Sequence, residues 1–424
     1  MSILIKSARI LSKGSPYHDK KLNILVSDAG VIKSIGKDVV SANSRVIEGK
    51  NLMVSIGWFD MRANFNDPGN EHKEDLISGL KVAASGGFTG ISLLPNTNPC
   101  VESKNEVSYL RAQNSNSITQ VYPMGAVTKG CKGEDFTEIL DMNAAGAVAF
   151  TDGEHPIWNT DILLKTLQYL QKFNGLLINK PEDTYLTAFG TMNEGVTSTY
   201  LGLKGMPDLA EEIMIRRDIE LLKYAGGRIH FANLSTAQSV KLVAEAKKNG
   251  LNVTCDVAIP NLLFDDTALE NYDTNYKVNP PLRSNRDIKA LEKAIVANDI
   301  DVIVSAHTPQ DEESKKLEFD HADFGMISLQ TFFPMILRKS DKIDLADSIK
   351  MFTVNPRAIL GLPIPQIKEG EKANLTIFDS TKKWSYNSKS NYSKSVNSPL
   401  YNTELTGCVI GVLNNGRSFF NSFK

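Results

Sequence analysis

The stretch GWFDMRANFNDPGNEH, which spans Gly57 to His72, decides how the chain folds. Residues Asn51 to Phe59 are mostly apolar and predict a buried strand, which ends at the acidic residue Asp60. Pro68 and Gly69 predict a loop soon afterwards. In barrel enzymes the C-terminal ends of the strands carry the side chains that reach the reacting centre. We therefore expect a functional edge of the molecule to begin at the end of this strand.

A strand–helix pattern repeats from about residue 53 to residue 366. Short apolar runs alternate with amphipathic segments such as Ser235 to Lys248 and Asp287 to Ala297. The further strand candidates are residues 90–94, 146–150, 175–178, 228–233, 251–257 and 301–305. Repeated βα units imply a parallel sheet covered by helices, and their number favours a closed barrel. We therefore predict an α/β fold with a (β/α)8 TIM-like barrel over residues 53–366.

Both ends of the chain are rich in short β-like pieces separated by turn residues. Because residues 1–52 and 367–424 share this texture, they are most simply read as one small β-sandwich built from both ends. The barrel is then inserted into that composite domain. The segment Ser385 to Ser398, rich in Lys, Ser and Asn, is expected to form a mobile loop.

The composition indicates an ordinary globular protein with a small-molecule or protein partner. A net charge of -2 gives no general attraction for nucleic acid or an anionic membrane. The four cysteines are far apart and show no CxxC spacing, which is typical of reduced thiols. The N-terminus lacks the apolar core of a signal peptide, and no run is long enough to span a bilayer. We therefore expect a cytoplasmic protein.

Several distinctive blocks follow one another along the chain. They are PNTNP at 95–99, FTDG at 150–153, EGVTSTYLGLKGMPDLAEE from Glu194, KVNPPLRSNRD from Lys277, FGMISLQT from Phe324, and the C-terminal NPRAILGL and KANLTIFD. Together these blocks resemble the type I dihydroorotases of the amidohydrolase superfamily. FTDG resembles the family's Phe-Ser/Thr-Asp-Asp-Gly segment, one residue shorter. Their order along nearly the whole chain makes chance similarity a poor explanation. The resemblance implies the same barrel inserted in a β-sandwich.

The resemblance also implies a reaction, the opening or closing of a six-membered cyclic amide. In the family, divalent metal ions produce a hydroxide and polarise the carbonyl, while an aspartate moves the proton. At the positions of the family's metal ligands and catalytic aspartate this sequence has Arg62, Asn64, Lys180, Asn233 and Ala306, with Asp152 retained as the bridging carboxylate. Two further family histidines are Asn261 and Leu262, and another is Gln310.

These replacements predict that the barrel does not bind the metal pair. Lysine and arginine offer no free lone pair to a metal at neutral pH, and alanine has no proton to move. We therefore expect no cofactor, with zinc as the alternative if the family activity is retained. A buried Asp152 without metals needs another cation, so we expect Arg62, Lys180 or both to form an ion pair with it.

The substrate-side positions are mixed. Asn96, Asn279 and His307 match family residues that contact substrate, whereas Asn66 stands where the family has an arginine for the substrate carboxylate. Asn96 and Asn279 are equally read as residues that cap loops. Ser235 and Thr236 are read as the N-cap of the helix that follows, rather than as nucleophiles.

Three functions stay open at this point. The first is a dihydroorotase homologue that has lost hydrolysis and serves as a non-catalytic partner, for which the resemblance implies aspartate carbamoyltransferase. The second is an active cyclic amidohydrolase that interconverts N-carbamoyl-L-aspartate and dihydroorotate. The third is a sensor that binds a pyrimidine precursor without reacting. A homodimer is expected from the resemblance.

Overall fold

Gly57 divides the opening stretch into two strands that belong to different sheets. In the computed structural model, which describes residues 1–423, β5 (Leu52–Ile56) pairs antiparallel with β15 (Leu375–Tyr386). After Gly57, β6 (Trp58–Ala63) pairs parallel with β7 (Phe88–Leu93). The single strand expected over residues 51–59 is therefore wrong.

The break at Gly57 has a steric cause. A Cβ atom there would lie 2.0 Å from Asn374 Oδ1 and 2.1 Å from Thr89 Oγ1. Those distances are far inside van der Waals contact, so this close approach of three chain segments requires glycine. The chain passes at this residue from the terminal sheet into the barrel.

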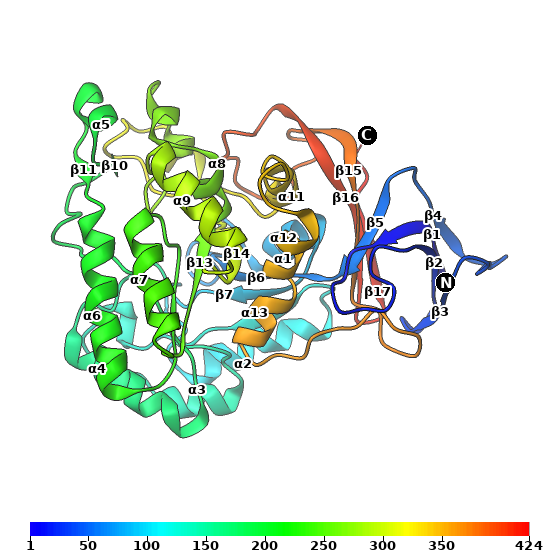
Figure 1. Ribbon diagram of the computed structural model, residues 1–424, viewed down its shortest axis with the longest axis horizontal. Coiled ribbons are helices and arrows are strands. Elements are labelled where there is room, and N and C mark those ends of the chain that lie inside the picture. The colour runs from blue at the N-terminus through cyan, green and yellow to red at the C-terminus, as the bar shows by residue number, and fades with distance from the viewer. Residues whose placement is uncertain (424) are drawn as a thin grey trace.

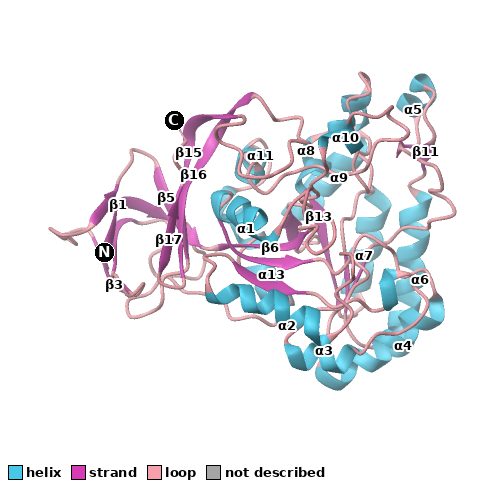
Figure 2. Ribbon diagram, turned by 180° about the vertical axis from the view of Figure 1, so that it is seen from behind, coloured by secondary structure: helices cyan, strands magenta, loops and turns pink. Residues whose placement is uncertain are grey.

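The barrel is built from parallel strands (Figures 1 and 2). A three-stranded sheet and a four-stranded sheet contain β6, β7, β8 (Gln120–Pro123), β9 (Leu177–Asn179), β12 (Ile229–Phe231), β13 (Val253–Ala258) and β14 (Val302–Val304). Phe150 bridges Gly125 to Leu177 and so joins the two sheets on one side. A bridge between Ala63 and His307 closes the other side. The chain thus forms the predicted TIM-like barrel.

Helices surround the strands, as Figure 2 shows. Their bounds are α1 (Leu76–Ser85), α2 (Lys104–Ala112), α3 (Ile139–Ala145), α4 (Thr160–Leu170), α6 (Leu209–Ala225), α7 (Ala237–Lys248), α8 (Ile259–Leu263), α9 (Asn285–Val296), α10 (Glu312–Lys315), α11 (Phe332–Leu337), α12 (Leu345–Met351) and α13 (Val354–Ile359). An excursion after β9 holds β10 (Met192–Asn193), α5 (Val196–Leu201) and β11 (Gly205–Met206). Thr236 caps α7 by accepting from the Ser239 amide, which confirms the predicted cap at this residue. Ser235, predicted with it, instead donates from its amide and hydroxyl to Glu211.

Both chain ends meet in an eight-stranded sheet beside the barrel (Figure 1). Its order is β17 (Arg417–Phe420), β16 (Thr403–Asn414), β15, β5, β1 (Ile3–Ile10), β2 (Lys21–Val26) and β3 (Ile32–Gly36), with β4 (Arg45–Ile47) pairing beside β1. Buried side chains from these strands, among them Ile5, Ile24, Val54 and Ile377, form a hydrophobic core of their own. The two chain ends thus share one sheet and one core.

Segment 385–398, expected to be mobile, is packed against the barrel. Ser393 Oγ donates to the buried Glu74, and Ser395 Oγ donates to the Lys73 carbonyl. Asn397 is almost fully buried and donates from Nδ2 to the Thr308 carbonyl. These contacts tie the segment to the rim of the barrel. Among residues 1–423, no helix has the length and apolarity that a membrane crossing requires.

Candidate functional site: an ion-pair network at the mouth of the barrel

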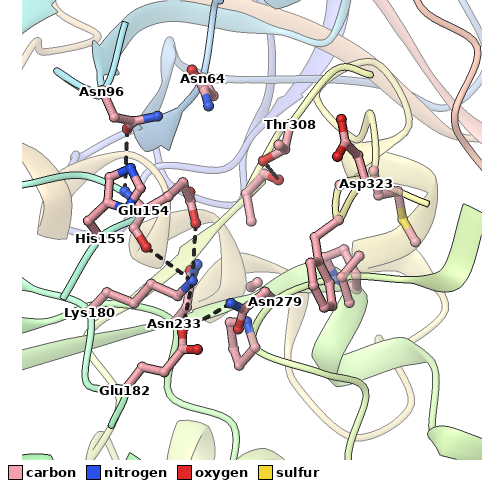
Figure 3. Close-up of a pocket in the computed structure, with 18 of the residues that line it drawn as sticks. Asn64, Asn96, Glu154, His155, Lys180, Glu182, Asn233, Asn279, Thr308 and Asp323 are labelled. Atoms are coloured by element: carbon pink, nitrogen blue, oxygen red, sulfur yellow. Dashed lines mark hydrogen bonds and ion pairs between the residues drawn. The ribbon is translucent and has the colours of Figure 1, made fainter. Parts of the chain in front are cut away.

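A cavity of about 440 Å³ opens at the C-terminal ends of the barrel strands (Figure 3). Asn64 follows β6, Lys180 follows β9, Asn233 follows β12 and Ala306 follows β14, and all four line this cavity. The parallel order of the strands brings these residues together from distant parts of the chain.

Arg62 lies on β6, and its side chain is only 2% exposed. Its Nη2 donates to the Gly153 carbonyl at 3.0 Å and lies 3.1 Å from Glu154 Oε1. With the Asn233 amide turned so that its oxygen faces the guanidinium, Arg62 Nε donates to that oxygen at 3.1 Å. The guanidinium is thus held by neighbouring strand ends rather than by solvent.

Lys180 is also buried, with its side chain 3% exposed. Its Nζ lies 3.3 Å from Glu154 Oε2 and 3.3 Å from Glu182 Oε2. Figure 3 shows Lys180 reaching toward Glu154, with Glu182 nearby on the same side of the cavity. Glu182 in turn accepts from Asn279 Nδ2 at 3.0 Å.

Glu154 therefore joins the two buried cations in one network, Arg62–Glu154–Lys180–Glu182. Burial opposes ionisation of Glu154, but Arg62 and Lys180 outweigh it and hold the pKa of this carboxyl below its usual range. Likewise, Lys180 and two hydrogen bonds outweigh burial and lower the pKa of Glu182. Both carboxylates are thus ionised at neutral pH and matched by cations.

The expected ion pair with Asp152 is wrong. Its carboxylate accepts from the amides of Val127 and Thr128, both at 2.9 Å, and from Thr128 Oγ1 at 2.5 Å. Burial raises the pKa of Asp152, although these hydrogen bonds oppose the rise. Three neutral donors from one loop satisfy this carboxylate, and Arg62 and Lys180 pair with Glu154 instead.

Asp60 is a second buried carboxyl, beneath the network. It accepts from the Ser305 amide at 3.1 Å and from the Ser305 hydroxyl, so it ties β6 to the end of β14. Burial raises the pKa of Asp60 from 3.8 to about 7. These contacts indicate that Asp60 is a structural carboxylate.

We expect Asp60→Asn to flatten the pH dependence of stability. Because the folded-state pKa lies above the unfolded one, the folded protein binds more protons between about pH 4 and pH 7. The stability contributed by this carboxyl is therefore present at low pH and lost as the pH rises through about 7, at up to about 1.4 kcal/mol per pH unit. Urea unfolding of the wild type and of Asp60→Asn across this pH range measures the difference. The same dependence of the unfolding free energy on pH in both proteins would contradict the prediction.

The four substrate-side positions divide into two pairs. Asn96 and Asn279 line the cavity, whereas Asn66 and His307 do not. Asn66 donates from Nδ2 to the Pro309 carbonyl at 3.2 Å. His307 is fully buried, with its Nδ1 accepting from the Ser328 amide at 3.1 Å. The two residues that reach the cavity are therefore both neutral amides.

Sequence reasoning missed Glu154, Glu182 and His155, all of which line the cavity. Glu154 lies two residues after Asp152, and Glu182 lies two residues after Lys180. A carboxylate two residues beyond a strand-end position was the available signal for both, because alternate residues of an extended segment point to the same side.

The side chains present do not fit a divalent metal pair. Arg62 and Lys180 are cations without a free lone pair, Asn64 and Asn233 are neutral amides, and Ala306 has no donor atom. The two acidic residues of the network already have cationic partners. Within residues 1–423, no three His, Cys, Asp or Glu side chains come together in a way that could share a metal ion.

Comparison with known proteins shows the family to which the chain belongs. A family model described as Dihydro-orotase-like matches residues 51–239, and one described as Amidohydrolase family matches residues 201–418. The chain is 36% identical over 411 residues to a dihydroorotase of Geobacter sp. (strain M21), covering 96% of each protein. It is 38% identical over 382 residues to a dihydroorotase of Pelotomaculum thermopropionicum, covering 89% of each. The chain belongs to the dihydroorotase family.

Solved structures agree with this fold. An L-hydantoinase (dihydropyrimidinase) from Arthrobacter aurescens superposes with a TM-score of 0.86 at 21% identity, covering 100% of this chain and 96% of that one. A dihydropyrimidinase from Brevibacillus agri NCHU1002 gives 0.83 at 20% identity, covering 99% and 95%. The chain thus has the amidohydrolase barrel fold.

Proposed function

We propose that this member of the dihydroorotase family does not hydrolyse cyclic amides and serves as a non-catalytic partner of another protein. The observation that carries the proposal is the network Arg62–Glu154–Lys180–Glu182, which occupies the strand ends with internally matched charges. A metal-bound hydroxide needs ligands with free lone pairs, and these cations offer none.

The network also lacks a side chain suited to proton transfer. Ala306 cannot accept a proton, and Glu154 is held ionised by two cations, which makes it a weak base. Asp152 accepts three hydrogen bonds from Val127 and Thr128, which occupy its carboxylate oxygens. No side chain of the network is therefore both free and basic enough to assist ring opening.

An exposed apolar segment supports the partner role. Tyr185, Phe189, Val196 and Tyr200 are almost fully exposed, and all lie in the excursion between β9 and α6. Phe189 also has a left-handed backbone with φ of 62°, a costly conformation for a bulky residue. Large exposed apolar side chains on a structured excursion are typical of protein interfaces. The family resemblance supplies aspartate carbamoyltransferase as the candidate partner.

A hydrolysis assay tests the loss of activity. The purified full chain, supplied with zinc or manganese, is expected to convert dihydroorotate no faster than buffer with the same metal. The Geobacter relative, assayed in parallel, serves as the positive control. Metal-dependent turnover by this chain that saturates with dihydroorotate would overturn the proposal.

Co-elution tests the partner. The full chain and aspartate carbamoyltransferase from the same cell are expected to elute together in size-exclusion chromatography. Phe189→Ser and Tyr200→Ser are expected to weaken the complex, because each removes an exposed aromatic side chain. Tyr224→Ser, another exposed aromatic residue but on α6, is the matched control and is expected to leave it unchanged. Separate elution of the unmodified proteins would reject this partner.

A further inference from the structure

Two of the four cysteines meet near the mouth of the barrel, although they lie far apart in sequence. Cys100 lies in the loop that follows β7, and Cys131 lies in the loop that follows β8. Their side chains are hydrogen-bonded to each other, and both thiols are free. Cys255 and Cys408, by contrast, are buried on the barrel strand β13 and on the terminal strand β16. Cys100 and Cys131 therefore form a dithiol pair.

Hydrogen bonds hold the two loops side by side. The Ala126 amide donates to the Val101 carbonyl at 2.8 Å, one residue beyond the first cysteine. The Gly130 amide donates to Glu102 Oε2 at 2.7 Å, one residue before the second cysteine. Two cysteines can be bridged without a large movement of the backbone only where their chain segments already lie this close. The fold itself thus brings the two thiols together.

The backbone at Cys131 is fixed in an unusual conformation. Its φ of 55° lies in the left-handed region, which costs energy for a residue with a Cβ atom. The Cys131 amide donates to the Thr128 carbonyl at 3.0 Å, and the Thr128 hydroxyl accepts from the Gly133 amide at 2.8 Å. These bonds close a tight turn, and in this turn the Cys131 thiol contacts Cys100.

The two thiols differ in exposure and in acidity. Cys100 is half-buried, whereas Cys131 is 3% exposed. The hydrogen bond from the Cys131 thiol stabilises a thiolate at Cys100 and lowers the pKa of Cys100, although burial opposes the shift. The same hydrogen bond, together with burial, raises the pKa of Cys131 and keeps that thiol protonated. Cys100 is therefore suited to react first with an oxidant from solvent, and Cys131 to react second.

We propose that Cys100 and Cys131 form a reversible disulfide when the protein meets hydrogen peroxide. The Cys100 sulfur attacks one peroxide oxygen as a thiolate and breaks the O–O bond, which gives a sulfenic acid and, with the proton that Cys100 released, water. The Cys131 sulfur then attacks the Cys100 sulfur and displaces its hydroxyl group, which leaves as water with the Cys131 proton. Two thiols and one peroxide thus yield one disulfide and two waters. Exchange with a dithiol reductant returns both electrons and restores both thiols.

The disulfide joins two loops that support the ion-pair network. The loop after β7 carries Asn96, whose Oδ1 accepts from the Glu154 amide at 3.3 Å. The loop after β8 carries Thr128, whose amide and hydroxyl donate to Asp152. The bridge also closes the chain from residue 100 to residue 131, which restricts the unfolded state. It forms whether the barrel hydrolyses a ring or serves as a non-catalytic partner.

Peptide mapping of the full chain tests the pair. The reduced protein is treated with a slight excess of hydrogen peroxide, denatured and alkylated, and its digest is analysed by mass spectrometry without reduction. A linked peptide pair containing Cys100 and Cys131 is expected, with Cys255 and Cys408 alkylated, and dithiothreitol is expected to restore all four thiols. Oxidation of Cys100 to a sulfinic acid with Cys131 still alkylated overturns the proposal, and so does an equal yield of bridges to another cysteine.

Serine variants assign the order of the two steps. In Cys131→Ser the sulfenic acid at Cys100 has no second thiol to meet, so it is expected to react with dimedone. In Cys100→Ser the thiol of Cys131 is expected to stay reduced, because it is 3% exposed. Cys408→Ser removes a buried thiol on β16 and is the matched control, expected to form the bridge as the wild type does. Equal dimedone labelling of the first two variants contradicts the assigned order.

Thermal unfolding distinguishes a bridge that fits the fold from oxidative damage. The oxidised wild type is expected to melt a few degrees above the reduced protein, and Cys100→Ser is expected to show no such rise. The same scans of the reduced proteins check that the variant folds, since its melting temperature is expected to lie within a few degrees of the wild type. A lower melting temperature in a sample that contains the linked peptides would show that the bridge strains the fold, and it would overturn the proposal.

Discussion

Glu154→Gln is expected to lower the free energy of unfolding by about 2–4 kcal/mol at neutral pH. The change removes the carboxylate shared by Arg62 and Lys180, whose side chains are 2% and 3% exposed. Lys180 keeps Glu182, but Arg62 loses its one anionic partner in the network. Because the Glu154 side chain is 27% exposed, the loss falls below that of a fully buried pair.

Urea unfolding measures this loss, and an exposed pair provides the control. Glu404 lies 2.8 Å from Lys383, with both side chains more than half exposed. Glu404→Gln is therefore expected to cost about 0–1 kcal/mol. If Glu154→Gln costs no more than this control, the network does not stabilise the barrel mouth.

Trp58→Ala is expected to cost about 3–5 kcal/mol of stability. Trp58 is fully buried, and its ring packs against Phe88, Phe333, Phe352 and Phe378 with centroid distances of 5.3–6.0 Å. Phe88 belongs to the barrel strand β7, whereas Phe378 belongs to β15 of the terminal sheet. The indole therefore fills the junction between the two parts of the molecule.

Two further substitutions distinguish the stability contributed by this junction from the effect of removing any aromatic side chain. Trp58→Phe keeps part of the ring contact and is expected to cost about half as much as the alanine variant. Tyr224→Ala removes an exposed ring and is expected to change stability by no more than about 0.5 kcal/mol. Similar losses for Trp58→Ala and Tyr224→Ala would show that the junction contributes little.

The barrel could be predicted because the sequence patterns that indicate it lie within short segments of the chain. Alternating apolar strands and amphipathic helices fix the βα order, and the cap at Thr236 follows from side-chain chemistry within four residues. The grouping of Lys180, Asn233 and Ala306 follows from the barrel topology, which places the end of every strand on one face.

What could not be predicted depends on contacts between distant segments. The break at Gly57 arises from Thr89 and Asn374, neither of which is near it in sequence. Asp152 and Glu154 are two residues apart, yet only the fold shows that the first binds the amides at 127 and 128 while the second meets both cations. The Lys, Ser and Asn content likewise suggested a mobile segment at 385–398. Its partners Glu74 and Lys73 lie more than 300 positions away, so the composition of the segment could not reveal them.

The central claim is that ion pairs have replaced the metal centre at the barrel mouth. The most direct measurement is the zinc content of the full chain, purified from cells grown with added zinc and analysed by mass spectrometry after dialysis. We expect zinc far below one ion per chain, since Glu154 is already paired with Arg62 and Lys180, and these two cations offer zinc no lone pair. One or two zinc ions per chain, lost on Asn64→Leu or Glu154→Gln, would contradict it.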